Sequence, residues 1–229
     1  MMKPLLRVIF PERCLACETR IESGDPLCVR CHAVFPWLPE AHCERCAAPF
    51  AAPQGGCHLC ATCLQGSYAL GKVWALGVYR GVLHDLIIRL KYRHQEWLAS
   101  PLADQMFHGW SGEGYDLVLP VPLHRRRLRQ RGFNQAAWLA RDLARHAHLQ
   151  YDPLRLRKHR ETVSQTELGR EARIKNNATS FSVTGDVAGL TILLVDDVYT
   201  TGATLESCAR VLQKAGAKEV DAYVVARAA

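Results

Sequence analysis

The chain has 229 residues, of which 48% are hydrophobic, and its formal net charge at pH 7 is +7. That length suits one domain of ordinary size plus a small one. We find no apolar run long enough to span a membrane and no signal-peptide pattern in the first ten residues, so we expect a cytoplasmic protein with reduced thiols. The positive charge favours an anionic partner, either nucleic acid or a phosphorylated small molecule.

Nine of the ten cysteines lie between Cys14 and Cys63, and most of them form Cys-x-x-Cys pairs. Two such pairs place four thiolates around one metal ion and close a structural zinc site. A disulfide framework is the alternative, but a reducing compartment argues against it. We therefore expect a double zinc ribbon over residues 1–66 and a second domain over residues 67–229. The expected zinc ligands are Cys14, Cys17, Cys28 and Cys31 in the first site, and Cys43, Cys46, Cys60 and Cys63 in the second.

The second set of ligands is ambiguous. Cys57 forms a further Cys-x-x-Cys pair with Cys60, so Cys57 and Cys60 could bind zinc in place of Cys60 and Cys63. We prefer Cys60 and Cys63, which leaves Cys57 free or as a competing ligand, and we interpret His58 as a surface residue. The remaining cysteine, Cys208, is expected to be a small buried hydrophobe in a late helix.

The middle of the chain alternates strand and helix patterns. Val73–Tyr79 has the composition of a strand, and the spacing of apolar residues from Leu83 to Leu90 predicts a helix with a basic end. Basic residues at a helix end are favoured by its dipole, which gives Lys91 and its basic neighbours an ordinary structural explanation. A second strand is predicted over Asp116–Pro122.

An arginine-rich segment follows the second strand. It holds five arginines in seven positions from Arg125 to Arg131, and it leads through Gly132 and Asn134 into an amphipathic helix. Guanidinium groups bind phosphate bidentately, and open α/β sheets bind ligands at the carboxyl ends of their strands. We expect an arginine-rich loop that binds a polyanion, with a solvated charge run as the alternative. No aromatic residue interleaves the arginines, which argues against base stacking.

A long polar segment spans Arg155–Asn177. Its lack of apolar periodicity suits a mobile loop that closes over a site. A flexible surface linker is the alternative.

The segment Thr191–Thr204 predicts a ligand site. A buried strand over Ile192–Val195 leads to two carboxylates, and a helix is expected from about Leu205 to Ala215. Unpaired N–H groups at a helix start bind phosphate, glycine permits close approach and threonine hydroxyls add donors. Carboxylates accept hydrogen bonds from ribose hydroxyls. The pattern therefore favours a ribose 5-phosphate group over an ordinary strand–loop–helix, with candidate residues Asp196, Asp197, Thr200, Thr201, Gly202, Ala203 and Thr204.

Together these motifs resemble the ComF family of competence-associated proteins. The similar stretches are the cysteine pairs, "LIIRLKYR", "VLPVPLHRRRLRQRGFNQAAWLARDLA", "RKHRETVSQTELGREARIKN" and "LLVDDVYTTGATL". The resemblance implies a type I phosphoribosyltransferase fold behind the zinc ribbons and binding of phosphoribosyl pyrophosphate (PRPP) with Mg²⁺. It also implies a role in natural transformation, in which imported single-stranded DNA is handled at the inner membrane face beside a helicase-like partner.

The resemblance also implies roles for individual residues. PRPP would contact the seven residues of the acidic pair and its loop, with Arg131, Gly132 and Asn134 near the pyrophosphate. If PRPP reacts, the catalytic residues would be Asp196 and Asp197, which hold the ribose, and Arg131, which holds the leaving pyrophosphate. No acceptor is evident from the chain. Three functions stay open: a DNA-uptake protein, a salvage phosphoribosyltransferase and a regulator that senses PRPP.

Overall fold

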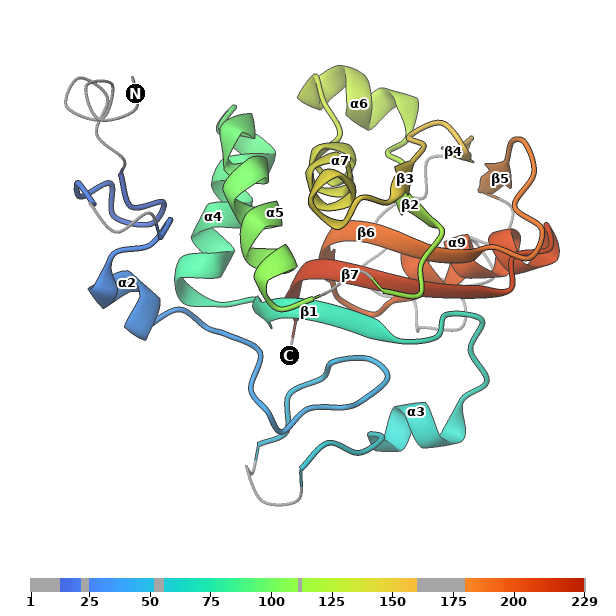
Figure 1. The fold of residues 1–229 in the computed structure, drawn as a ribbon, viewed down its shortest axis with the longest axis horizontal. Helices are drawn as coiled ribbons and strands as arrows, with labels where there is room; N and C mark the ends of the chain where they lie inside the picture. The colour runs from blue at the N-terminus through green and yellow to red at the C-terminus, as the bar shows by residue number, and fades with distance from the viewer. Residues whose placement is uncertain (1–12, 22–24, 52–55, 111–112, 160–179, 229) are drawn as a thin grey trace.

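A parallel β-sheet lies at the centre of the molecule, with helices on both faces (Figure 1). The computed structural model describes residues 13–21, 25–51, 56–110, 113–159 and 180–228. Five strands lie in the order β1-β7-β6-β2-β3, and every neighbouring pair is parallel. The α/β fold class predicted for the larger part of the chain is confirmed. The strands are β1 Val73–Val78, β2 Leu117–Pro120, β3 Gln150–Tyr151, β6 Thr191–Tyr199 and β7 Glu219–Arg227.

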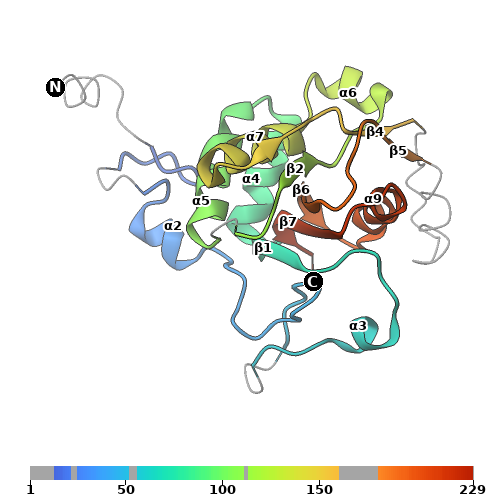
Figure 2. The same ribbon diagram turned by 45° about the vertical axis from the view of Figure 1, so that its right-hand side comes forward.

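The helices divide between the two faces of the sheet. One face packs against α4, α5 and α7, and the other face packs against α9 (Figures 1 and 2). A 3-10 turn, η1, leads into α5, and a short antiparallel pair, β4 and β5, lies outside the main sheet. These elements are α4 Gly81–Tyr92, η1 Glu96–Leu98, α5 Ala99–His108, α7 Gln135–Ala147, α9 Ala203–Lys214, β4 Leu156–Lys158 and β5 Phe181–Val183.

The apolar run in β6 explains why this strand is central. Leu193 and Val195 pack into the core on the side of α4, α5 and α7, whereas Ile192 and Leu194 pack into the core on the side of α9. Side chains of a strand alternate between faces, so a strand covered on both sides needs a continuous apolar run. Cys208 of α9 is fully buried in the second of these cores, as predicted.

Two expectations about secondary structure were wrong. The arginine-rich segment is not a loop but a short helix, α6 Arg125–Arg131, which begins after the side-chain cap of His124 and ends at Gly132 with φ 84°. None of its residues is buried, so it lacks the apolar face by which a helix is recognised in a sequence. The strand predicted to end at Val195 continues through the acidic pair to Tyr199 because its far end pairs with β7.

The two zinc ribbons repeat one local structure. In each, the first Cys-x-x-Cys turn is followed by a residue with positive φ, Glu18 at 62° and Ala47 at 53°, whose N–H donates to the carbonyl of the first cysteine. The second turn of each ribbon begins at the N-cap cysteine of a five-residue helix. These helices are α2 Val29–Ala33 and α3 Ala61–Gln65.

Each ribbon packs against a different face of the larger domain. Leu15 and Phe35 of the first ribbon join the core formed with α4 and α5, whereas Cys46 and Cys63 of the second join the core formed with α9. Figure 1 shows the first ribbon beside α4, and Figures 1 and 2 show the second beneath β1. The ribbons therefore approach the sheet from separate directions.

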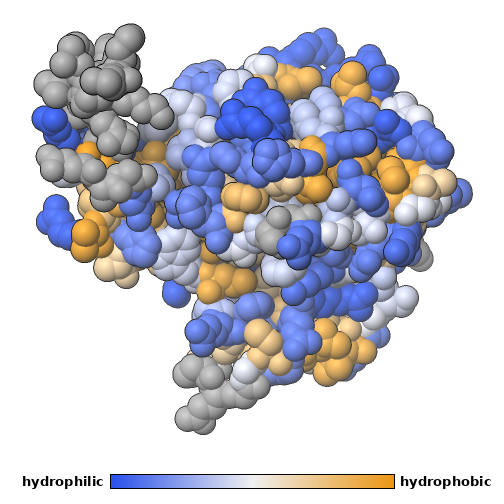
Figure 3. Space-filling view, viewed as in Figure 1, coloured by the Kyte–Doolittle hydropathy of each residue, from blue (hydrophilic) through white to orange (hydrophobic). Residues whose placement is uncertain are grey.

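The molecular surface is mainly hydrophilic on the face shown in Figure 3, with hydrophobic residues in scattered patches. Within the described ranges, none of the helices combines the length and apolar character that a membrane crossing requires. Most of the long polar segment, residues 160–179, lies outside the described residues, so the predicted loop over the site stays a prediction.

Candidate functional site

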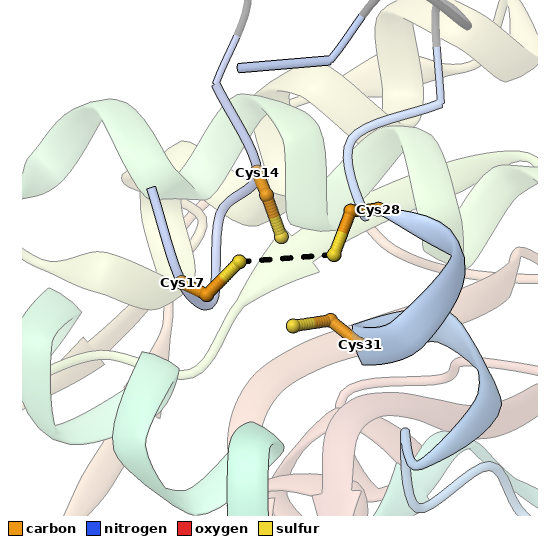
Figure 4. A group of neighbouring side chains, drawn as sticks. All are labelled: Cys14, Cys17, Cys28 and Cys31. Carbon is orange, nitrogen blue, oxygen red and sulfur yellow. Dashed lines mark hydrogen bonds between the residues drawn. The ribbon is translucent and has the colours of Figure 1, made fainter. Parts of the chain in front are cut away.

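The first four predicted zinc ligands converge on one point (Figure 4). The Sγ atoms of Cys14, Cys17, Cys28 and Cys31 all lie within 4.8 Å of one another, and the Sγ atoms of Cys17 and Cys28 are 3.7 Å apart. A tetrahedral zinc ion with Zn–S bonds of about 2.3 Å separates its sulfurs by about 3.8 Å. The four thiols therefore fit a closed structural zinc site.

The second site has the same dimensions. Cys43, Cys46, Cys60 and Cys63 form the group of sulfurs within 4.8 Å of one another, and the Sγ atoms of Cys46 and Cys60 are 3.8 Å apart. Cys57 lies outside this group. It is exposed, and its thiol donates to the carbonyl of Glu40 at 3.0 Å. The geometry favours Cys63 over Cys57 as the fourth ligand, and the neighbouring His58 is exposed, as predicted.

The predicted phosphate loop connects β6 to α9. Thr200 and Thr201 follow the strand, and Gly202 occupies the N-cap position with φ 75°. A Cβ atom on Gly202 would lie 2.1 Å from the Tyr199 hydroxyl oxygen, so only glycine fits beneath that ring. Ala203 and Thr204 form the first turn of the helix, where backbone N–H groups and the helix dipole favour an anion.

The two carboxylates of the acidic pair have different surroundings. Asp197 is buried, and its Oδ1 atom lies 2.6 Å from Nζ of Lys91 on α4. Its Oδ2 atom accepts a hydrogen bond from the side-chain amide of Gln135 on α7. Asp196 is partly exposed, and its Oδ1 atom accepts a hydrogen bond from the N–H of Asp197. Asp196 is therefore the more accessible carboxylate, and Asp197 connects β6 to two helices.

The charges of Asp196, Asp197 and Lys91 depend on one another. Desolvation of the carboxylate by the surrounding protein and the neighbouring Asp197 carboxylate raise the pKa of Asp196 from 3.8 to about 7. Burial alone would lower the pKa of Lys91, but attraction to Asp197 and Asp196 outweighs it, so the pKa of Lys91 is raised. Lys91 thus stays cationic at neutral pH, while Asp196 can gain or lose a proton there.

The residues expected near a pyrophosphate lie between α6 and α7. Asn134 caps α7 by accepting from the N–H of Ala136, and its own amide donates to the carbonyl of Val121. The Arg131 guanidinium donates to Gln135 at 2.7 Å, and Gln135 in turn donates to Asp197. Arg131 and the acidic pair therefore belong to one hydrogen-bonded network.

A cationic basin adjoins this network. It has a volume of about 620 Å³ and is lined by Lys91, Tyr92, His94, Arg127, Gln130 and Arg131. Sequence reasoning attributed Lys91 to a helix end and assigned no role to Tyr92 or Gln135. The stretch "LIIRLKYR", which carries part of the family resemblance, could have indicated Lys91 and Tyr92, whereas Gln135 lies in another such stretch, "VLPVPLHRRRLRQRGFNQAAWLARDLA".

Two domain families match the chain. Residues 5–64 match the double zinc ribbon domain, and residues 134–229 match the phosphoribosyl transferase domain. The second match includes Asn134, the acidic pair and the loop before α9.

Several named proteins are similar to nearly the whole chain. A "DNA utilization protein YhgH" of Salmonella typhimurium is 30% identical over 81% of this chain and 83% of its own length. "Competence protein F" of Haemophilus influenzae is 27% identical over 96% of this chain and 98% of its own. "Competence protein ComFC" of Bacillus subtilis is 25% identical over 93% of this chain and 94% of its own.

Proposed function

The chain belongs to the ComF family, and from this premise we propose that it binds PRPP with Mg²⁺ and handles incoming single-stranded DNA during DNA uptake. The observation that carries the PRPP part is the arrangement at the end of β6, where an accessible carboxylate, Asp196, precedes a tight loop on the N-terminus of α9. The names of the competence and DNA utilization relatives support the DNA part.

In this proposal the ligand lies along one edge of the sheet. The 5-phosphate binds the backbone N–H groups and hydroxyls of Thr200–Thr204, and the ribose hydroxyls bind Asp196. The pyrophosphate faces the cationic basin, where Arg131 and Lys91 offset its charge. Asp197 already binds Lys91 and Gln135, so its role is to orient these two side chains.

Mg²⁺ fits this donor set because an ionised carboxylate beside a polyphosphate is its usual environment. When bound, the ion would neutralise charge on the pyrophosphate, and Asp196 would hold it together with the ribose hydroxyls. If PRPP reacts, Asp196 and Asp197 favour positive charge at the ribose and Arg131 holds the departing pyrophosphate.

Single-stranded DNA would bind a surface beside the basin, which we call the DNA strip. It consists of the exposed arginines of α6 with Tyr92, Trp138 and Arg141. Helix α6 presents exposed arginines, and the structure adds aromatic residues from other parts of the chain. The Arg131 guanidinium lies 5.0 Å from the centroid of the Tyr92 ring, which is 63% exposed. The ring centroids of Phe133 and Trp138 lie 6.0 Å apart with the rings tilted at 56°, and the Arg141 guanidinium lies over the Trp138 ring. Cations beside exposed rings suit phosphates and stacked bases, and these rings support a stacking mode although no aromatic residue interleaves the arginines in the sequence.

We also propose that the protein works with a helicase-like partner at the inner face of the membrane, as the family resemblance implies. The division into residues 1–66 and 67–229 also stays part of it, with the zinc ribbons as docking surfaces for the partner or for DNA.

Calorimetry on the zinc-loaded protein tests the PRPP site. We expect Mg²⁺·PRPP to bind the unaltered protein and Asp196→Asn to weaken that binding at least tenfold, about 1.4 kcal/mol. Unchanged affinity in the variant would reject the site. A parallel assay for pyrophosphate release with bases and amines distinguishes the salvage enzyme from a protein that binds PRPP without consuming it.

Salt-dependent binding of an oligothymidylate tests the DNA strip. Trp138→Ala should weaken binding by about 1–3 kcal/mol without changing the salt dependence, because it removes stacking. Arg127→Ala should reduce the slope of log affinity against log salt by about 0.7, because it removes one phosphate contact. Lys72→Ala is the matched control, since Lys72 also lies over an aromatic ring, that of Trp74, but beside the edge strand β1, which β7 and β6 separate from β2. Equal effects of all three variants would reject the strip.

A further inference from the structure

Arg227, at the end of β7, connects the second zinc ribbon to the phosphate loop. Its Nε atom donates to the backbone carbonyl of Cys46, a predicted zinc ligand, at 3.0 Å. Its Nη1 atom donates to the carbonyl of Thr200 at 3.2 Å. The same guanidinium lies 4.7 Å from the centroid of the Tyr199 ring. One side chain thus contacts both the metal-binding turn and the loop.

The pairing of β6 with β7 places Arg227 where it can make these contacts. Tyr199 and Arg227 are opposite each other in the parallel register. The Tyr199 ring is buried and covers Gly202 so closely that no Cβ would fit there. Because Arg227 lies against that ring and binds the carbonyl of the next residue, it restrains the conformation of the loop before α9.

The second ribbon is packed tightly against the same loop. Cys46 and Cys63 share a core with Tyr199 and with Leu205 of α9. A space of only about 10 Å³ lies between these groups, which is at the lower limit for a single water molecule. A movement of the ribbon would therefore be transmitted to Tyr199 rather than absorbed by a cavity.

The carbonyl of Cys46 is oriented by the metal-binding turn. The turn places Ala47 at φ 53° and closes with a hydrogen bond from its N–H to the carbonyl of Cys43 at 2.9 Å. A zinc ion bound to both cysteines would hold this turn, since a structural zinc site supplies folding free energy.

We propose that Arg227 is a positioning residue through which the second zinc site holds the Thr200–Thr204 loop in its anion-binding conformation. The identity of the ligand, PRPP, rests on the proposed function. The coupling between the second zinc site and the loop does not. The coupling predicts that the loop becomes more mobile, while the sheet stays folded, when the second site loses its zinc. The same is expected when Arg227 no longer binds the carbonyls of Cys46 and Thr200.

Hydrogen exchange on the zinc-loaded full chain without PRPP measures the coupling directly. We expect Arg227→Gln to accelerate exchange about tenfold in peptides covering 199–205, with both zinc ions retained. Cys60→Ser should lose one zinc and accelerate the same peptides, and combining the two changes should add little. Arg155→Gln is the matched control, because Arg155 also donates to a distant backbone carbonyl, that of Asp186 at 2.5 Å, but away from the loop.

A PRPP titration of the same variants separates the two proposals. Weakening of PRPP affinity by about tenfold in Arg227→Gln and not in Arg155→Gln supports the coupling. Loop exchange that is unchanged in Arg227→Gln overturns it, whether or not PRPP binds. Accelerated loop exchange in a protein that binds no PRPP supports the coupling and rejects the proposed ligand.

Discussion

Lys91 and Asp197 form a largely buried ion pair, with 2.6 Å between Nζ and Oδ1, that joins helix α4 to strand β6. This contact separates the roles of two adjacent carboxylates that look equivalent in the sequence. Asp197 holds a cation at the edge of the basin, and Asp196 is left accessible. Gln135 extends the contact to Arg131, so the residues proposed for PRPP depend on one another for orientation.

Removal of the cation should destabilise the fold. In Lys91→Met, Asp197 loses its charge partner in a buried position, which costs about 3–5 kcal/mol for pairs of this kind. Urea unfolding measures the free energy of unfolding. The double variant Lys91→Met with Asp197→Asn should recover a large part of the loss, because no buried charge remains. A change within about 0.5 kcal/mol for Lys91→Met alone, as at ordinary surface positions, would contradict this prediction.

Opposite pH dependences are expected for stability and ligand binding. The pKa of Asp196 is about 7 in the fold and 3.8 ordinarily, so the folded state holds this proton more tightly than the unfolded state. The protonated Asp196 carboxyl therefore stabilises the fold. This contribution to the free energy of unfolding is complete below about pH 4 and is lost as the pH rises through about 7. Binding of Mg²⁺·PRPP needs the ionised form and should strengthen over the same range.

Thermal melts and calorimetry between about pH 5 and pH 8 measure the two effects. Asp196→Asn is the control, since it should remove the contribution of this group to both profiles. If the variant keeps the same pH dependence of PRPP affinity, another group titrates and the assignment to Asp196 is wrong.

Two glycines allow the conformation of the loop to be tested. Gly202 and Gly189 have similar φ values, 75° and 72°, but only at Gly202 would a Cβ meet another atom within 4 Å. Gly189→Ala should cost about 1–2 kcal/mol for the left-handed backbone alone. Gly202→Ala should cost more, because Tyr199 must also move, and it should weaken PRPP binding. Equal unfolding free energies for the two variants would show that the Tyr199 contact is unimportant.

Metal analysis checks the zinc ligands. We expect two zinc ions per chain, and one after Cys63→Ser, because each closed site needs four thiolates. Cys57→Ser is the matched control and should retain two. A protein that loses zinc on replacement of Cys57 but keeps both ions without Cys63 would use the alternative ligand set.

Some features of this protein follow from the sequence because they depend on local spacing. Four Cys-x-x-Cys pairs place eight thiolates at intervals that suit two tetrahedral metal sites, whatever the chain does elsewhere. The apolar run Ile192–Val195 requires a strand covered on both faces, and a glycine among threonines predicts a tight turn before a helix. These patterns also carried the family resemblance.

Other features were decided by the tertiary structure because they depend on residues that are distant along the chain. The helix α6 has no apolar face, so its sequence resembles a charged loop. Asp197 contacts its cation, Lys91, on α4, and Arg131 of α6 contacts its aromatic neighbour, Tyr92, on the same helix. Arg227 reaches a cysteine carbonyl 181 residues away. Packing of the sheet and the ribbons creates these contacts, and no local periodicity or ligand spacing encodes them.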